Sequence, residues 1–95
     1  MERNRYIKAQ IESQVCSSLA EINSNFTDII IKYNSKQMDP SNALQLFKNL
    51  ISMLGDLEQV CTNSDIKVYS ISNIKSQIYK AVDCVKNREA ISIGE

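Results

Sequence analysis

The apolar residues between positions 39 and 62 recur with the period of a helix. Six of them fall on one line along a helix, at alternating steps of four and three residues: Ala43, Phe47, Leu50, Leu54, Leu57 and Cys61. Five more lie beside that line, three on one side and two on the other: Leu46, Met53 and Val60, then Leu44 and Ile51. At about 100° per residue they cover an arc of roughly 200°, which is wider than the apolar stripe of an ordinary surface helix. The pattern predicts a central helix with neighbours on two sides.

Start and stop signals mark the ends of this helix. Asp39 is suited to cap the first turn through its carboxylate, and Pro40 suits the first helical position because it lacks an N–H. Asn63 is a candidate for the left-handed residue that ends a helix. We therefore predict a helix over residues 40–61. Gly55 inside it has two interpretations: another backbone or a partner approaches there, or the glycine is tolerated near an exposed surface.

A longer apolar seam predicts a first helix over residues 4–34. Its members recur at steps of three and four residues, with a coiled-coil heptad pattern from the third member onward: Ile7, Ile11, Val15, Leu19, Ile22, Phe26, Ile29 and Tyr33. The cluster Asn23-Ser24-Asn25 offers a break into two helices, and the β-branched run 26–33 offers a strand. Because the seam crosses the cluster without a change of phase, we expect one continuous or gently kinked helix. At 1.5 Å per residue it exceeds the central helix by roughly 13 Å, so it should overhang, bend or break.

Residues 70–90 are predicted to form a third helix with one apolar face: Ile71, Ile74, Ile78, Ala81, Val82 and Val85. Residues 65–69 precede it as a short strand or an extended connector. The C-terminal residues are expected to fray, because Ile91 and Ile93 have little to bury them. The short segment after Asn34 suits an antiparallel turn. The predicted fold is therefore all-α: an antiparallel helical hairpin plus a third helix, in one domain, giving a three-helix bundle, or four helices if the first one breaks.

Composition places the chain among ordinary globular domains. Its 95 residues contain eleven acidic and eleven basic side chains, so no net charge points to nucleic acid or membrane. The N-terminal sequence has no apolar signal-peptide core, and no apolar run approaches the length of a membrane span. Cys16, Cys61 and Cys84 are far apart and do not suggest a disulfide framework; each lies on or near a predicted apolar face, so we expect all three to be buried. The chain is predicted to be a soluble cytoplasmic protein.

The sequence lacks the residue patterns that carry common enzyme chemistry. It has no histidine and no C-x-x-C pair, so it offers neither the usual base for a nucleophile nor a ligand set for zinc. With two glycines it has no glycine-rich phosphate loop. Its acidic residues are dispersed along polar faces, as is typical of solvated charges. We therefore expect no enzymatic activity, no cofactor and no metal site.

Basic residues are concentrated in the last third of the chain. Residues 66–88 hold five bases and one acid, whereas residues 9–31 hold three acids and no base. Lys75, Tyr79 and Lys86 lie along one edge of the third predicted helix. This edge predicts either a weak contact with an anion or a nucleic acid, or a complement to the acidic face of the first helix, within one molecule or across a dimer.

The width of the central apolar arc suggests a binding surface. If two neighbouring helices leave part of it bare, the bare side is that of Leu46, Met53 and Val60, extended by Leu50 and Leu57. If the third helix covers that side, no such surface remains. Contiguous exposed apolar patches mark interaction sites. We therefore predict a non-enzymatic helical module that binds another protein chain, of the same or a different kind, as a complex subunit, an adaptor, or a small chaperone or inhibitor. The alternative is a small nucleic-acid-associated regulator that uses the basic edge of the third helix.

One turn resembles part of a known family. Residues 36–44, Lys36-Gln37-Met38-Asp39-Pro40-Ser41-Asn42-Ala43-Leu44, are similar to the helix–turn–helix joint of type III secretion needle subunits, which carry a Pro-Ser-Asn or Pro-Ser-Asp turn before an Ala/Leu-rich helix. The likeness covers nine of the 95 residues; the family's second proline is missing, and the third helix has no counterpart. The resemblance implies a helical hairpin at this turn. By size and class alone, secretion-system chaperones or subunits and bacteriocin immunity proteins are further alternatives.

Overall fold

Three helices joined by short turns make up the structure. In this computed structural model the backbone is described for residues 2–91 and the side chains for residues 7–91. The helices are α1 (Glu2–Asn34), α2 (Pro40–Asn63) and α3 (Tyr69–Lys86). No strand occurs within residues 2–91, and the helices contact one another, which confirms the predicted all-α three-helix architecture.

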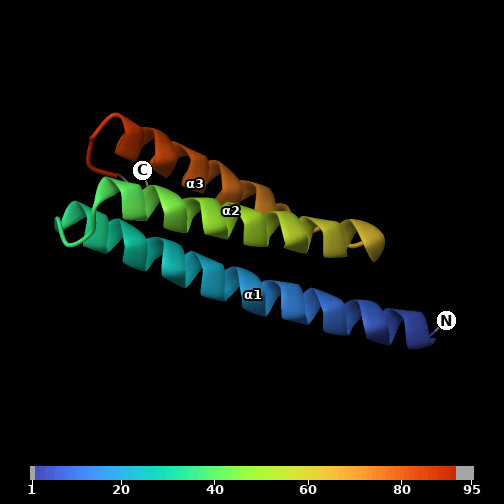
Figure 1. Ribbon diagram of the computed structural model, residues 1–95. Helices are drawn as coiled ribbons and strands as arrows, with labels where there is room; N and C mark the ends of the chain where they lie inside the picture. Colours follow the sequence, from blue (N-terminus) through green and yellow to red (C-terminus); the bar gives the residue numbers. More distant parts are fainter. Residues whose placement is uncertain (1, 92–95) are drawn as a thin grey trace.

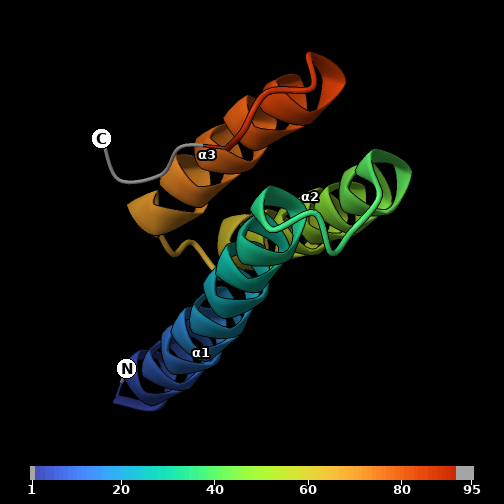
Figure 2. The ribbon, with the colours of Figure 1, turned by 90° about the vertical axis from the view of Figure 1, so that its left-hand side faces the viewer.

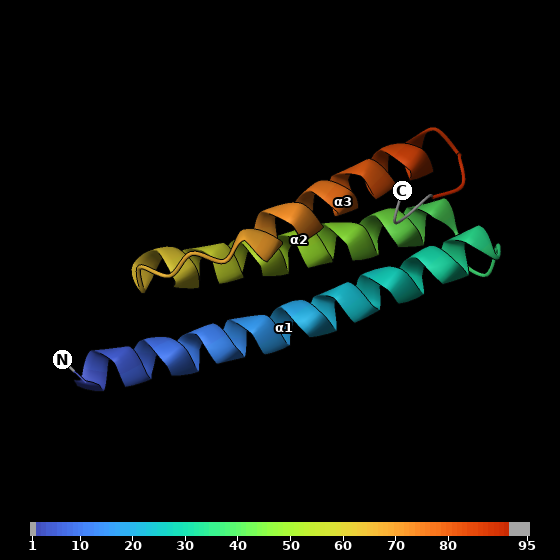
Figure 3. The ribbon, with the colours of Figure 1, turned by 180° about the vertical axis from the view of Figure 1, so that it is seen from behind.

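The central element of the bundle is α2. It runs antiparallel to α1, and α3 runs antiparallel to α2 and crosses it obliquely (Figure 1). Both neighbours pack more extensively on α2 than they pack on each other. The molecule is elongated, with extents of 52 × 24 × 17 Å, and the N-terminal turns of α1 extend beyond the end of α2 (Figure 3). Of the three outcomes predicted from its length, the long first helix therefore shows the overhang.

The core lies between the apolar faces of the three helices. The rings of Phe26 on α1 and Phe47 on α2 meet edge to face, with centroids 5.6 Å apart, and neither side chain is more than 2% exposed. The other buried residues come from all three helices and the segment after α3: Val15, Leu19, Ile22, Ile29, Ile30, Ala43, Leu50, Leu54, Cys61, Ile71, Ile78, Ala81, Val85 and Ile91. No polar or charged side chain among the described residues is buried. Apolar burial, at about 25 cal/mol per Å², is thus the main force that joins the helices.

The alternatives considered for the first helix are excluded. The helix continues through Asn23-Ser24-Asn25, so it does not break into two, and residues 26–33 are helical rather than a strand. The hydroxyl of Thr27 donates a hydrogen bond of 3.0 Å to the Asn23 carbonyl within the helix. Packing of the continuous apolar seam against α2 outweighs the weak helix propensity of a few residues, since tertiary contacts supply most helical stability in proteins.

Some helix ends differ from the predicted ones. The end of α2 is at Asn63 rather than at 61, and α3 ends at Lys86 rather than at 90. Residues 66–68 form an extended connector, seen between α2 and α3 in Figure 2, and not a strand. Tyr69 already begins α3.

The start of α2 differs from expectation in one detail. Asp39 is the N-cap residue and Pro40 takes the first helical position, but the Asp39 side chain makes no capping hydrogen bond. Its backbone carbonyl instead accepts a bond of 3.0 Å from the N–H of Ala43, which begins the helical ladder. The exposed carboxylate still lies at the positive end of the helix dipole.

All three helices end in the same backbone motif. The residue after each C-cap is left-handed, and two hydrogen bonds close the end, as in a Schellman motif. The left-handed residues are Lys36 (φ 62°), Asp65 (φ 55°) and Arg88 (φ 57°). The bonds run from N–H to carbonyl at 2.8–3.3 Å: Lys36 to Tyr33, Gln37 to Lys32, Asp65 to Thr62, Ile66 to Cys61, Arg88 to Val85 and Glu89 to Cys84. Asn63, the predicted left-handed residue, is still helical, and each end carries about 1 kcal/mol of strain because its left-handed residue is not glycine.

The segment after α3 folds back over that helix (Figure 2) and is hydrogen-bonded to Asn34 at the end of α1. The N–H of Ile91 donates to Asn34 Oδ1 at 2.9 Å, and Asn34 Nδ2 donates to the Ile91 carbonyl at 2.9 Å. Ile91 is 6% exposed and joins the core. The expectation that the C-terminal residues fray is therefore wrong for Ile91, because the early end of α3 lets the chain turn back; Ile93 lies outside the described residues.

Candidate interaction surface

Three large apolar side chains follow one side of α2 at intervals of seven residues. Leu46, Met53 and Val60 are 37%, 44% and 41% exposed, respectively. Seven residues make almost two complete turns, so all three project from the same side of the helix. We call this set the α2 stripe. It is the part of the predicted surface that the structure leaves open to solvent.

The other side of α2 is occupied by α3, which leaves the stripe uncovered. Leu44 and Ile51 line a groove between α2 and α3, and Glu58 reaches Lys75 of α3. Leu46 is two residues, about 200°, from Leu44 around the helix. The alternative in which the third helix covers the stripe is therefore excluded.

The other two residues predicted for this surface lie deeper. Leu50 is 5% exposed and belongs to the core. Leu57 is half-buried and packs against the core. Both belong to the apolar line of α2 that runs from Ala43 to Cys61, on the side nearer the stripe. Leu50 is therefore not part of the candidate surface, and Leu57 contributes only its edge.

Polar residues border the stripe on its outer side. Asn49 and Asp56 are exposed there, each about one turn from Met53. The amide of Gln45 donates a hydrogen bond of 3.2 Å to Asn49 Oδ1 along the same border. With one carboxylate among these side chains, the stripe has little electrostatic character. The stripe is therefore mainly apolar in character.

The predicted basic edge of α3 is partly used inside the molecule. Lys75 Nζ lies 2.8 Å from Glu58 Oε1, and the hydrogen bond to this carboxylate raises the pKa of Lys75. Within the molecule, the carboxylate that pairs with Lys75 thus comes from α2 and not from the first helix. Tyr79 and Lys86 lie farther along the edge and line the groove between α2 and α3. Lys75 does not line this groove, and its charge is already paired with Glu58.

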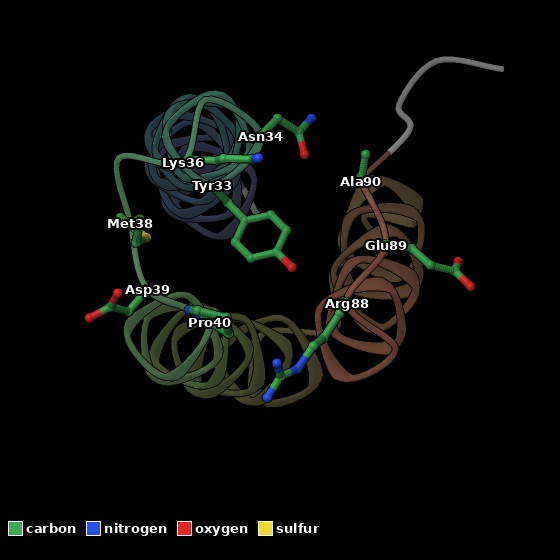
Figure 4. Close-up of a pocket in the computed structure, with 9 residues that line it drawn as sticks. All are labelled: Tyr33, Asn34, Lys36, Met38, Asp39, Pro40, Arg88, Glu89 and Ala90. Atoms are coloured by element: carbon green, nitrogen blue, oxygen red, sulfur yellow. The ribbon is translucent and has the colours of Figure 1, made fainter.

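An open pocket of about 360 Å³ lies where the α1–α2 turn faces the segment after α3 (Figure 4). Nine residues line it: Tyr33, Asn34, Lys36, Met38, Asp39, Pro40, Arg88, Glu89 and Ala90. The ring of Tyr33 points into the space between the helices, and Arg88 reaches toward the start of α2. Because two cations, Lys36 and Arg88, are balanced by two carboxylates, Asp39 and Glu89, the pocket has no net charge with which to select a ligand.

The three cysteines have different surroundings, and none forms a disulfide. Cys61 is buried, and burial raises the pKa of its thiol, with smaller contributions from Cys16, Glu12 and Glu58. Cys84 is half-buried and Cys16 is exposed. The expectation of burial is therefore wrong for Cys16, which lines an open hollow between α1 and α3.

Sequence reasoning missed one structural contact, that between Asn34 and Ile91. The residues are 57 positions apart, so no periodic pattern links them. The available signal was weak: an asparagine ends the first apolar seam, and an isolated isoleucine follows the third. Neither feature indicates its partner.

Further features that could suggest a function are absent from the described part of the chain. Within residues 7–91, no three metal-binding side chains lie close enough together to hold an ion. None of the described helices combines the length and apolarity that crossing a membrane requires. Comparison with family models, curated proteins and solved structures gives no match to this chain.

Proposed function

We propose that the chain is a non-catalytic helical module that binds another protein chain through the α2 stripe. The observation that carries this proposal is the exposure of Leu46, Met53 and Val60 at regular intervals on the central helix. Contiguous apolar side chains on a domain surface usually mark a place that a partner covers. Such a module acts as a complex subunit, an adaptor, or a small chaperone or inhibitor.

The spacing of the stripe fits a helical partner. A helix laid along α2 meets one stripe residue every two turns, and its own side chains insert between them, as in the knobs-into-holes packing of a coiled coil. Leu57, half-buried beside the stripe, adds to the area covered. Met53 stands at the centre, and its flexible thioether adapts to an irregular partner surface.

The border of the stripe favours a protein over a nucleic acid as the partner. Asn49 and Gln45 are uncharged and Asp56 is acidic, so the stripe does not attract phosphate. On the basic edge of α3, Lys75 is held by Glu58 at 2.8 Å. The nucleic-acid alternative therefore has less support than a protein partner.

Met53→Lys tests the proposal, with Gln59→Lys as the matched control. Both positions are exposed on α2, but Gln59 lies away from the stripe. We expect the wild type either to self-associate in sedimentation velocity over a range of concentrations or to retain a specific chain when purified from its native source. Met53→Lys should lose that association, because burying a lysine charge against an apolar partner surface is costly. Gln59→Lys should keep it.

The proposal fails if the wild type stays monomeric, binds an apolar dye no more strongly than Met53→Lys, and retains no chain whose recovery depends on Met53. Circular dichroism of both variants checks that the helices are intact. A gel shift with DNA and RNA at low and high salt tests the nucleic-acid alternative, since binding through basic side chains weakens steeply as salt rises.

A further inference from the structure

A second surface lies on the opposite side of α2 from the stripe. It is an open groove of about 310 Å³ between α2 and α3, lined by seven residues: Leu44, Lys48, Ile51, Tyr79, Val82, Asp83 and Lys86. We call it the α2–α3 groove. Its apolar floor consists of half-buried side chains, Leu44 and Ile51 from α2 and Val82 from α3. Tyr79 is 50% exposed and forms part of the wall.

Two lysines stand on opposite walls of this groove. Lys48 belongs to α2 and Lys86 to α3; both are exposed, and neither forms a salt bridge within residues 7–91. Asp83 also lines the groove and likewise has no salt bridge among those residues. Two positive charges and one negative charge leave the rim with a net charge of +1. By contrast, Lys75 on the same edge of α3 is neutralised by Glu58.

We propose that the α2–α3 groove binds an amphipathic helix of a partner protein that carries acidic residues on both sides of its apolar face. Two antiparallel helices with an apolar groove between them accept a third helix, whose side chains insert between theirs at an interaxial distance of about 8–10 Å. Because Lys48 and Lys86 belong to opposite walls, a carboxylate on each flank of the bound helix meets a cation. The groove is separate from the α2 stripe, so this binding goes beyond the function proposed above.

The composition of the groove distinguishes this occupant from a nucleic acid. A phosphate backbone has no apolar face to bury against Leu44 and Ile51. The rim charges contribute mainly to the choice and orientation of the partner, while the apolar floor contributes contact area. Tyr79 adds an aromatic ring with a polar end, a side chain enriched in protein interfaces.

Selection from a displayed peptide library tests this inference. The library holds helical peptides of about 18 residues, with fixed leucines on one face and flanking positions randomised among Glu, Gln and Lys. Peptides selected on the immobilised wild type should be enriched in Glu over Lys on both flanks. In fluorescence anisotropy the best peptide should bind the wild type about tenfold more tightly than the Lys48→Glu/Lys86→Glu double variant. The difference should shrink at high salt.

Three control variants locate the binding. Lys67→Glu/Lys80→Glu makes the same change in charge at exposed positions outside the groove and should leave peptide affinity within about twofold of the wild type. Met53→Lys alters the α2 stripe and should also leave peptide affinity unchanged. Failure of the proposed binding at the stripe and failure of the proposed binding at the groove therefore give different results. Val82→Asp places a charge in the apolar floor and should abolish binding. Circular dichroism confirms that each variant is folded.

The inference is overturned if the library yields no binding peptide, if selected peptides carry Glu and Lys at their input ratio, or if the best peptide binds the Lys48→Glu/Lys86→Glu variant as tightly as the wild type. The inference is also overturned if the selected peptides bind Val82→Asp as tightly as they bind the wild type, because the binding site then lies outside the groove. If duplex DNA oligonucleotides displace the peptide, and longer, more highly charged duplexes displace it more strongly, the groove is a nucleic-acid site instead.

Discussion

Asn34 and Ile91 are 57 residues apart and are joined by two hydrogen bonds of 2.9 Å. The side-chain amide of Asn34 bonds both the backbone N–H and the backbone carbonyl of Ile91. The contact fastens the segment after α3 to the last residue of α1. It adds a link between α1 and α3, the two helices that pack least extensively on each other. Through it the buried Ile91 side chain is held in the core.

Replacing Asn34 with alanine should destabilise the protein by about 1–2 kcal/mol, because both hydrogen bonds are lost together and the Ile91 backbone loses its partner. Asn25→Ala is the matched control: Asn25 is exposed on the same helix, and alanine there should leave stability unchanged or raise it slightly. Urea unfolding followed by circular dichroism measures both variants. Equal stability of Asn34→Ala and the wild type would show that the contact is not formed in solution.

Lys36→Gly should stabilise the protein by about 0.5–1 kcal/mol. Lys36 has a φ of 62°, a left-handed conformation that glycine adopts without the steric cost of a Cβ atom. The gain is limited because glycine also increases the entropy of the unfolded chain. Lys36→Ala is the control, since it removes the lysine side chain but keeps Cβ, and it should give no gain. A higher unfolding midpoint for both variants would assign the effect to the lysine charge rather than to backbone strain.

Gly55→Ala should also stabilise the protein, by about 0.5–1 kcal/mol, because alanine is the better helix former. No atom outside the local helix lies within 4 Å of the place where a Cβ of residue 55 would be, so the methyl group enters open space. This geometry favours the interpretation of Gly55 as a tolerated exposed glycine. Ser52→Ala on the same helix should give about half the gain. Destabilisation by Gly55→Ala in thermal unfolding would contradict this interpretation.

Lys75→Gln should reduce stability by less than about 1 kcal/mol near neutral pH, because the Lys75 and Glu58 side chains are 33% and 44% exposed and solvent screens their pair. The hydrogen bond to Glu58 raises the pKa of Lys75 in the folded state. The stabilisation that the Lys75–Glu58 pair contributes is therefore fully present below the pKa of lysine in the unfolded chain, about 10.4. It is lost as the pH rises through the higher pKa of Lys75 in the folded protein.

The pH dependence gives this prediction its measurement. The difference in unfolding free energy between the wild type and Lys75→Gln should stay constant from about pH 7 to 9 and close above about pH 10.5. Lys67→Gln, which removes an exposed lysine with no salt bridge among the described residues, should show no such convergence. A difference between wild type and Lys75→Gln that persists unchanged to about pH 11 would argue against the ion pair.

The helices were predictable because each has a strong local pattern. The apolar line from Ala43 to Cys61 and the signal at Pro40 located α2 to within two residues at its C-terminal end. The end of α3 was missed by four residues, since no glycine marks its left-handed Arg88. The sequence also could not show that the Asp39 side chain makes no capping hydrogen bond. An aspartate is preferred at the N-cap position, but the helix can begin there without that bond.

The candidate surface was predictable only in part. The excess width of the arc on α2 identified Leu46, Met53 and Val60, and these are exposed in the structure. The same reasoning also included Leu50, which is buried. Angular position on a helix says which residues share a face, but it does not say how far a neighbouring helix reaches around that face.

By itself, the sequence determined that this chain forms three amphipathic helices with α2 the most apolar, because helical periodicity and helix ends depend on residues a few positions apart. The tertiary structure alone decided how deeply Leu50 is buried, which carboxylate pairs with Lys75, and that Asn34 holds Ile91. These outcomes depend on how whole helices are placed against one another. That placement is set by the summed burial of many distant side chains, and no local pattern records it.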